Sequence, residues 1–214
     1  MKSLKNYIYE SIDQNVNEGL ISWFKSFFMK AFKNNESLIK GNKVNMLKMD
    51  VNKLSLNKEV VPLSNLPKEN LENYKNSKIG YQDTYFIIKN ISKYTESSTN
   101  NIFIYQYTYA GDKQYDAGII MYDGDPDNRK KENYCHILSI EYNKIVDNPT
   151  DVLGAMFNQF SIEIKKKKKS LEGFSICKNR LRKFGEVCRI LKFKESEDSK
   201  DSTDNTNPIF IRTI

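Results

Sequence analysis

Two side chains that can take up a proton lie in one strand-like run of the sequence. The run YCHILSIEY carries His136 and Glu141, which fall on opposite faces of a regular strand because side chains alternate along it. An imidazole or a carboxylate can act as a general base when it reaches a reacting amine or water. A single histidine in a strand is more often packed or hydrogen-bonded, so a structural role for His136 remains an alternative to a catalytic one.

The segment after this run has the pattern of a helix whose start could receive an anion. The sequence PTDVLGAMFNQFSIEIKKKKKS places Thr150 as the N-cap and Asp151 in the first turn. Its predicted buried stripe consists of Leu153, Met156, Phe157, Phe160 and Ile164. Lys165 to Lys169 follow at the C-terminal end, where cations oppose the negative end of the helix dipole. Free N–H groups at such a helix start bind phosphate.

The elements that position these residues follow from short-range patterns. NNIFIYQYTYAG and QYDAGIIMYDG predict a hairpin that turns at Gly111 and Asp112. Residues 42–56 alternate like a half-buried strand, and residues 81–94 are ambiguous between strand and helix.

Further elements are predicted on both sides of this central part. A short helix is expected within residues 64–80. After the lysines come a strand in EGFSIC, a helix in NRLRKFGEVCRIL, and strands in KFKES and PIFIRTI, with a polar excursion at residues 197–207 between the last two.

Two amphipathic stretches stand at the N-terminus. MKSLKNYIYESI and GLISWFKSFFMKAFKNNE both repeat apolar residues at helical spacing. The second is basic on its polar side. We interpret it as a core helix packed on a sheet, with a membrane-surface or partner-binding helix as the alternative.

Composition limits the classes of function. The chain has 214 residues, a net charge of +7, three cysteines without CxxC spacing, and no apolar run of the roughly 18 residues that span a bilayer. We therefore expect a soluble protein of a reducing compartment, or a particle component made inside a cell. The positive charge favours an anionic partner such as a nucleic acid, a phosphorylated cofactor or an acidic protein, but it is mild, and no zinc-finger, RNP or basic-zipper pattern supports nucleic-acid binding. That option rests on Lys165 to Lys169 with Arg180, Arg182 and Lys183.

The order of the predicted elements resembles the GNAT family of N-acetyltransferases over roughly residues 42–214. The residues that carry the resemblance are HILSIEY, VLGAMF and NRLRKFGEVCRILKFKES. It implies an α/β fold with a mixed, mostly antiparallel central sheet flanked by helices, plus extra N-terminal helices. We accordingly divide the chain into an N-terminal helical segment, residues 1–40, and a GNAT-like acyltransferase domain, residues 41–214.

The resemblance also implies an activity, the transfer of an acyl group from acyl-CoA to an amine, with acetyl-CoA as the cofactor and no metal. The family holds the pyrophosphate on free amides of a Gln/Arg-x-x-Gly-x-Gly/Ala loop at a helix start, here aligned so that Gly154 takes the last glycine and Pro149 the Gln/Arg. The implied cofactor-binding residues are Ile140, Val152, Leu153, Gly154, Ala155 and Asn179. Asp151 departs from the pattern, because it places a carboxylate where phosphate would bind.

The same resemblance assigns two catalytic roles. Glu141 lies near the end of the strand, where the family often keeps its base, with His136 as the other candidate. Cys188 stands where the family often has a tyrosine that protonates the departing thiolate. A thiol could do the same, but a small buried apolar residue is the alternative.

The first dozen residues are also similar to the targeting peptides of tailed-phage internal head proteins. These peptides are cleaved after a short sequence motif that Ile8, Tyr9 and Glu10 match, so residues 1–10 are a candidate for proteolytic removal. An ordinary amphipathic first helix is the alternative. The resemblance implies a second function, a non-catalytic phage protein that is virion-associated or packaged, contacts phage structural proteins through its N-terminal helices, and resides in the host cytoplasm or the virion.

Overall fold

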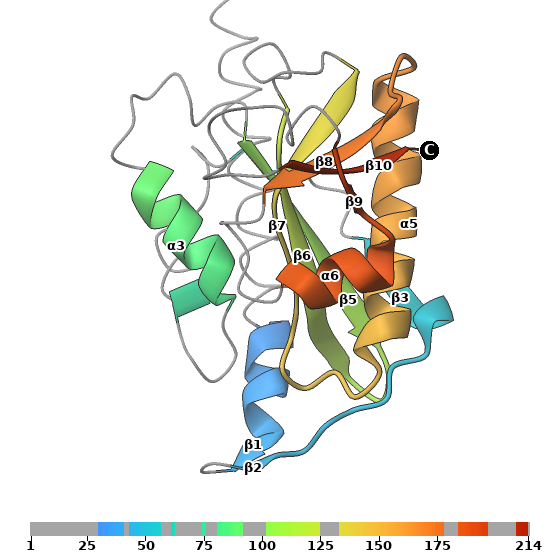
Figure 1. The fold of residues 1–214 in the computed structure, drawn as a ribbon. Coiled ribbons are helices and arrows are strands. Elements are labelled where there is room, and N and C mark those ends of the chain that lie inside the picture. The colour runs from blue at the N-terminus through green and yellow to red at the C-terminus, as the bar shows by residue number, and fades with distance from the viewer. Residues whose placement is uncertain are drawn as a thin grey trace, which may run out of the picture.

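A mixed β-sheet with helices on both faces forms the centre of the protein (Figure 1). The computed structural model describes residues 30–40, 43–56, 61–62, 74–75, 81–91, 102–124, 133–177, 184–196 and 209–213. Across the sheet the strands are β3 (Leu54–Leu56), β5 (Ile102–Ala110), β6 (Gln114–Asp123), β7 (Tyr134–Tyr142), β8 (Gly173–Cys177), β10 (Ile209–Thr213) and β9 (Lys194–Glu195). β4 (Val61–Pro62) also pairs with β5.

The neighbouring strands of this sheet are antiparallel, except that β7 and β8 run parallel. After β5 and β6 the chain order is β7, α5 (Pro149–Lys167), β8, α6 (Phe184–Leu191), β9 and β10. This is the order predicted from the sequence. The predicted fold class, a mixed and mostly antiparallel sheet flanked by helices, is therefore confirmed.

The hairpin at the centre of the sheet forms where the alternating aromatic pattern predicted it. β5 and β6 pair from Ile102–Asp123 to Ala110–Gln114, and residues 111–113 make the turn. A register shift at Tyr107 and Thr108 increases the local twist of the pair.

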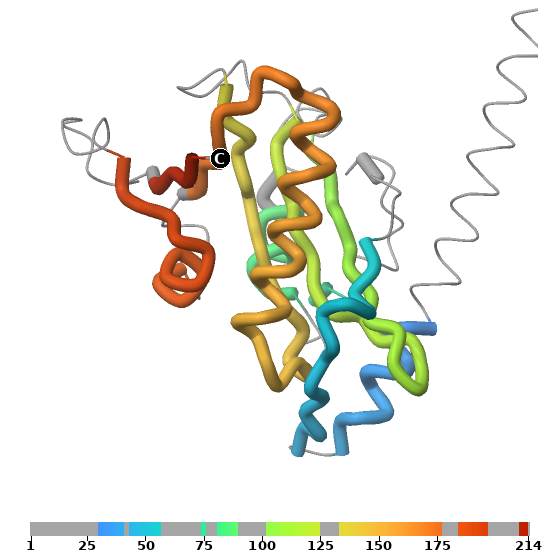
Figure 2. Tube along the Cα trace, turned by 90° about the vertical axis from the view of Figure 1, so that its right-hand side faces the viewer, coloured from blue at the N-terminus to red at the C-terminus, as the bar shows by residue number. Residues whose placement is uncertain are grey.

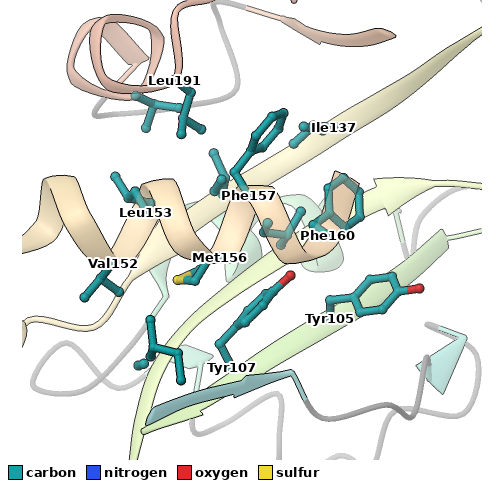
Figure 3. Close-up of a cluster of buried hydrophobic side chains, with 14 of the residues drawn as sticks. Tyr105, Tyr107, Ile137, Val152, Leu153, Met156, Phe157, Phe160 and Leu191 are labelled. Atoms are coloured by element: carbon teal, nitrogen blue, oxygen red, sulfur yellow. The ribbon is translucent and has the colours of Figure 1, made fainter. Parts of the chain in front are cut away.

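α5 covers one face of the sheet and buries the predicted stripe. Its buried residues are Val152, Leu153, Met156, Phe157, Phe160 and Ile164. In Figure 3, Met156 and Phe160 lie toward Tyr107 and Tyr105 of β5, whereas Leu153 and Phe157 lie on the side of Leu191 of α6. In Figure 2, where the viewer faces this side, α5 runs in front of the strands.

The opposite face is covered by α3 (Gln82–Ile91) and by the helical residues 30–37. Residues 81–94, ambiguous in the sequence, are thus helical where the structure describes them. Phe32, Tyr81 and Ile88 pack with Ile119 and Met121 of the sheet in one buried cluster. For residues 30–37 the interpretation as a core helix holds; the rest of the two predicted N-terminal helices, residues 1–29, lies outside the described residues.

Residues 42–56 do not form the single strand that their alternation predicts. β2 (Lys43–Val44) pairs only with β1 (Ile39–Lys40), and Val51–Lys53 form a 3-10 helix, η1. The carboxylate of Asp50 accepts a hydrogen bond from the N–H of Asn52 at 3.0 Å, which favours a turn at this point. Only Leu54–Leu56 joins the main sheet.

Several predicted segments lie outside the described residues, namely most of residues 64–80 and the excursion at residues 197–207. None of the helices in the described part of the chain is long and apolar enough to cross a membrane.

Candidate active site

Within the described residues, the two parallel strands at the centre of the sheet pair only along the first part of the longer strand, β7. β7 and β8 pair from Tyr134–Gly173 to Ile137–Ile176. β7 then continues to Tyr142, and no described residue of β8 pairs with residues 138–142. The chain passes from the end of β7 through a short loop into α5.

Glu141 lies on β7 beyond the residues that pair with β8, and it binds the first turn of α3. Its Oε1 accepts a hydrogen bond from the N–H of Asp83 at 3.1 Å. Its Oε2 accepts from the N–H of Thr84 at 2.9 Å and from the Thr84 hydroxyl at 2.8 Å. A helix leaves the N–H groups of its first turn without intrahelical partners. Glu141 thus caps α3 from a neighbouring strand.

The same surroundings change the acidity of this carboxyl group. Burial raises the pKa of Glu141 to about 7, the negative charge of Asp83 adds to the rise, and the hydrogen bonds from Thr84 and Asp83 oppose it. A carboxylate with a pKa near the working pH is well suited to accept a proton from a substrate. Glu141 therefore combines a fixed orientation with the acidity expected of a general base.

A β-bulge in β7 interrupts the alternation of side chains just before Glu141. Tyr122 of β6 pairs with Ile137, but the next residue of β6, Met121, pairs with Ser139. Leu138 is the extra residue of the bulge. Such an insertion moves every later side chain to the other face of the sheet.

The bulge brings the two candidate bases onto the same face. Ile137 and Ile140 both pack into the cluster on the α5 face, so Glu141 points to the α3 face. His136 also faces away from α5, because both of its neighbours in sequence belong to that cluster. The prediction that they lie on opposite faces is wrong. His136 lies roughly 15 Å along the strand from Glu141, and its Nδ1 is 3.0 Å from the Oγ of Ser175.

Cys188 lies on the other side of the sheet from Glu141. Its side chain is buried in α6 within the apolar cluster on the α5 face. Burial raises the pKa of Cys188 to about 11, so transfer of its proton to a thiolate with an ordinary pKa of about 8.5 is uphill. The position fits a small buried apolar residue better than a proton donor.

α5 begins earlier than predicted. Asn148, not Thr150, is the N-cap, and Pro149 takes the first helical position, where its missing N–H is tolerated. The N–H of Val152 already donates to the C=O of Asn148 at 3.2 Å. The prediction that the amide of Val152 is free for a ligand is therefore wrong. The amides that helix geometry leaves without a partner are those of Thr150 and Asp151.

The side chain of Asn148 does not cap the helix. Its Oδ1 accepts from the N–H of Met49 at 2.9 Å and its Nδ2 donates to the C=O of Met49 at 3.0 Å. The Nδ2 also lies 3.2 Å from a carboxylate oxygen of Asp151, which is exposed. The side chain of Asn148 therefore leaves the start of α5 without a cap, and the carboxylate of Asp151 adds a negative charge there.

The remaining residues predicted to bind the cofactor differ in how far their side chains are buried. The side chains of Leu153 and Ile140 are buried in the core, whereas Gly154 and Ala155 are half-buried. A Cβ built on Gly154 would meet no atom within 4 Å, so the chain is open on that side. Asn179 lies outside the described residues.

Sequence reasoning missed a fully buried carboxylate on the α3 face. Asp116 of β6 accepts hydrogen bonds from the Tyr81 hydroxyl, from Gln106 at 2.6 Å and from Asn143 at 3.0 Å. Burial raises its pKa to about 6, and these hydrogen bonds oppose the rise. Asn35 adds two hydrogen bonds to the Asp116 backbone. The signal in the sequence was a single carboxylate inside the apolar strand run YDAGIIMY.

Asp116 also holds the turn that leads from β7 to α5. Asn143, the first residue after β7, donates its side-chain amide to Asp116 and its backbone N–H to the C=O of Ala117 at 2.8 Å. The Asn143 Oδ1 accepts from the N–H of Ile145 at 3.3 Å. The direction in which the chain leaves Glu141 is thus set by a buried polar cluster.

Several solved structures are similar in arrangement to this protein. One is an acetyltransferase from Salmonella typhimurium that modifies the N-terminal serine of a 50S ribosomal subunit protein, with 12% identity, 78% of this chain and 98% of that chain covered, and a TM-score of 0.44. Another is an acetyltransferase of the GNAT family from Desulfovibrio desulfuricans, with 8% identity, 75% and 98% covered, and a TM-score of 0.44. A third is an IAA acetyltransferase from Bacillus cereus, with 9% identity, 75% and 99% covered, and a TM-score of 0.42.

No family model matches the chain, and no curated protein matches it by sequence. Because the TM-scores of these three structures do not exceed 0.44, the fold class of this protein rests on its own strand order.

Proposed function

We propose that the protein is a GNAT-like N-acyltransferase that moves an acyl group from acyl-CoA to an amine, with Glu141 as the general base. The observation that supports this most directly is the position of Glu141. It follows the residues of β7 that pair with β8, it precedes the start of α5, and its pKa is raised to about 7.

Glu141 would take the proton that the amine loses when its nitrogen bonds to the acyl carbon, either directly or through a water molecule. Its two contacts with Thr84 occupy the lone pairs of Oε2 and keep the carboxylate oriented, whereas Oε1, among the described residues, accepts only from the N–H of Asp83 and keeps a lone pair for the proton. Acetyl-CoA, when bound, supplies the thioester whose C–S bond breaks. Since Cys188 is a weak acid on the other face, we assign protonation of the departing thiolate to solvent.

The start of α5 fits the phosphates of this cofactor only in part. Thr150 and Asp151 offer amides at the positive end of the helix dipole. The carboxylate of Asp151 repels the same phosphates, by about 1 kcal/mol for two charges 4 Å apart in water. We therefore propose that the protein binds acetyl-CoA weakly, and that Asp151 limits the affinity.

Isothermal titration calorimetry with acetyl-CoA tests this function. We expect measurable binding that tightens about fivefold in Asp151→Asn, because one repulsive charge is removed. The control is Glu195→Gln, which removes an exposed charge on β9 and should leave the affinity for acetyl-CoA unchanged. No heat of binding at millimolar acetyl-CoA in either the wild-type protein or Asp151→Asn would refute the proposal.

The base is tested by the rate of acyl transfer to amine acceptors. Glu141→Gln should lower kcat far more than it changes the affinity for acetyl-CoA. An unchanged kcat would reject Glu141 and leave His136 as the candidate base.

A second proposed function is that of a non-catalytic phage protein, virion-associated or packaged, for which the fold is a scaffold. Pro149 and Asp151 favour it, because they remove one donor and add a carboxylate at the helix start. The phrase Ile8, Tyr9 and Glu10 supports it from the sequence. Mass spectrometry of purified phage particles tests this proposal: absence of the chain from the particles contradicts it.

A further inference from the structure

A pocket of about 330 Å³ lies between the C-terminal end of α5 and the strands β5, β6 and β7. It is remote from the candidate active site. Asp123 at the pocket pairs with His136 across the β6–β7 ladder, whereas Ile119 pairs with Glu141. Asp123 and Ile119 are four residues apart on β6, so the pocket lies roughly 13 Å along the sheet from Glu141. The pocket also opens on the α5 face, and Glu141 points to the other.

The walls of the pocket are largely aromatic and apolar. Phe103 and Tyr122 stack with ring centroids 5.5 Å apart and planes 26° apart. Tyr122 in turn meets the buried ring of Phe160 at 5.3 Å, so the wall is supported from behind. Tyr134 and Ile164 complete it. Tyr122 is also stacked against Tyr105, with ring centroids 5.5 Å apart, so it offers a ligand the edge of its ring. A volume of this size with a rigid aromatic wall suits a small ligand that has a flat ring of its own.

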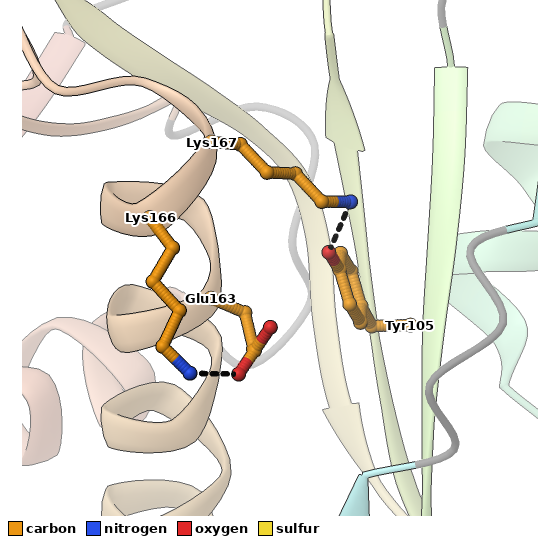
Figure 4. Close-up of polar contacts among 4 residues, drawn as sticks. All are labelled: Tyr105, Glu163, Lys166 and Lys167. Atoms are coloured by element: carbon orange, nitrogen blue, oxygen red, sulfur yellow. Dashed lines mark hydrogen bonds and ion pairs between the residues drawn. The ribbon is translucent and has the colours of Figure 1, made fainter.

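Charged groups stand at the edge of this wall. Lys167 and Lys168, the last residue and the C-cap of α5, both line the pocket, as does Asp123. Figure 4 shows Lys167 reaching over the sheet, where its Nζ donates to the Tyr105 hydroxyl at 3.0 Å. Among the described residues that line the pocket, two ammonium groups thus stand beside one carboxylate.

We propose that this pocket binds a small organic anion that carries a flat unsaturated ring, such as an aromatic carboxylate. The ring would lie against Phe103 and Tyr122, and the anionic group would meet Lys167 and Lys168. The site does not depend on the proposed acyl transfer, because it shares no residue with Glu141 or the start of α5.

Other ligand classes fit the pocket less well. A bare phosphate would leave the aromatic wall unused, and an amine would face two cations. Burial raises the pKa of the Cys135 thiol to about 12, which favours the protonated sulfur and makes it a poor nucleophile toward a ligand. In the described part of the chain no cluster of three His, Cys, Asp or Glu residues could hold a metal ion.

Isothermal titration calorimetry of the full chain with 2-naphthoate tests the proposal. We expect saturable binding that weakens about tenfold or more in the double variant Lys167→Gln/Lys168→Gln, because the two ammonium groups that attract the carboxylate are removed. The matched control is Lys165→Gln/Lys166→Gln, which removes the same charge from the same turn. In Figure 4 Lys166 points away from Tyr105 to Glu163, with which it forms an exposed ion pair at 2.8 Å. The control should retain the wild-type affinity.

Two further ligands make the test specific. The neutral analogue 2-naphthylmethanol should bind more weakly than 2-naphthoate, and acetate, which has no ring, should not compete with it. Acetyl-CoA should not displace 2-naphthoate. The proposal is overturned by a lack of saturable binding, by equal weakening in the two double variants, by equal affinity for the neutral analogue, or by displacement with acetyl-CoA.

Discussion

Glu141 on β7 caps α3 through Thr84, which donates both its N–H and its hydroxyl to one carboxylate oxygen, at 2.9 and 2.8 Å. The contact joins a strand of the sheet to the helix that covers it. The same carboxylate is the candidate base, so one side chain has a structural task and a proposed chemical task. The two tasks can be separated, because a cap needs only an acceptor whereas a base needs a group that takes up a proton.

Removal of this cap should destabilise the fold. In Glu141→Ala the N–H groups of Asp83 and Thr84 lose their acceptor, and we expect the free energy of unfolding to fall by about 1–3 kcal/mol. Glu141→Gln keeps an acceptor oxygen and should lose less. Urea unfolding followed by circular dichroism measures both. The exposed Glu195→Ala is the control and should stay within about 0.5 kcal/mol of wild type; equal effects in the two alanine variants would contradict the capping role.

Stability should fall as the pH rises from weakly acidic to neutral. The pKa of Asp116 is raised from 3.8 to about 6 and that of Glu141 from 4.5 to about 7. The folded state therefore keeps these two protons over windows of about pH 4–6 and 4.5–7 in which the unfolded chain has lost them. Each group contributes stability that is complete below its unfolded pKa and is lost as the pH passes its folded pKa, with a slope of up to about 1.4 kcal/mol per pH unit.

The measurement is the free energy of unfolding between about pH 4 and 8. Asp116→Asn has no titrating group at this position, so its profile should be flatter between pH 4 and 6 than that of wild type, whatever its absolute stability. Parallel profiles of the variant and the wild type would show that Asp116 does not titrate in this range.

Two glycines should respond in opposite ways to the same substitution. A Cβ built on Gly118 of β6 would lie 2.6 Å from the Cε of Met156 and 2.7 Å from the C=O of Glu141. We expect Gly118→Ala to lose about 1–3 kcal/mol by overpacking. Gly154→Ala is the matched control, since its Cβ meets nothing within 4 Å in a helix interior, and it should gain about 0.5–1 kcal/mol. Thermal unfolding of the two variants checks the contrast, and a tolerated Gly118→Ala would disprove the close approach of α5 to β6.

The core between α5 and the sheet should depend strongly on Phe160. This fully buried ring contacts the rings of Tyr105, Tyr122 and Phe174. We expect Phe160→Ala to lower the free energy of unfolding by about 3–5 kcal/mol, because a cavity is left behind. Ile162→Ala, two residues away and 49% exposed, should change it by less than about 0.5 kcal/mol. Similar losses in both variants, measured by urea unfolding, would contradict this packing.

Local periodicity was enough to locate most of the fold. The alternation in residues 102–123 and 134–142 and the apolar stripe of residues 149–167 predicted the hairpin, β7 and α5, because neighbours along the chain determine these patterns. Residues 42–56 also alternate, yet only Leu54–Leu56 reaches the sheet. In this segment the residues alternate as a strand requires, but the turn at Asp50 interrupts the strand, so the described residues before it do not pair with β5.

The candidate site was predictable in its residue types but not in its geometry. Glu141 stood out as a carboxylate at the end of an apolar strand, whereas its face depended on a bulge that appears only when β7 is paired with β6. Its cap on Thr84 joins residues 57 positions apart, and the contact of Asn35 with Asp116 joins residues 81 apart. Contacts of this kind leave no periodic trace in the sequence, because they arise when distant segments pack on the same sheet and must satisfy each other's buried polar groups.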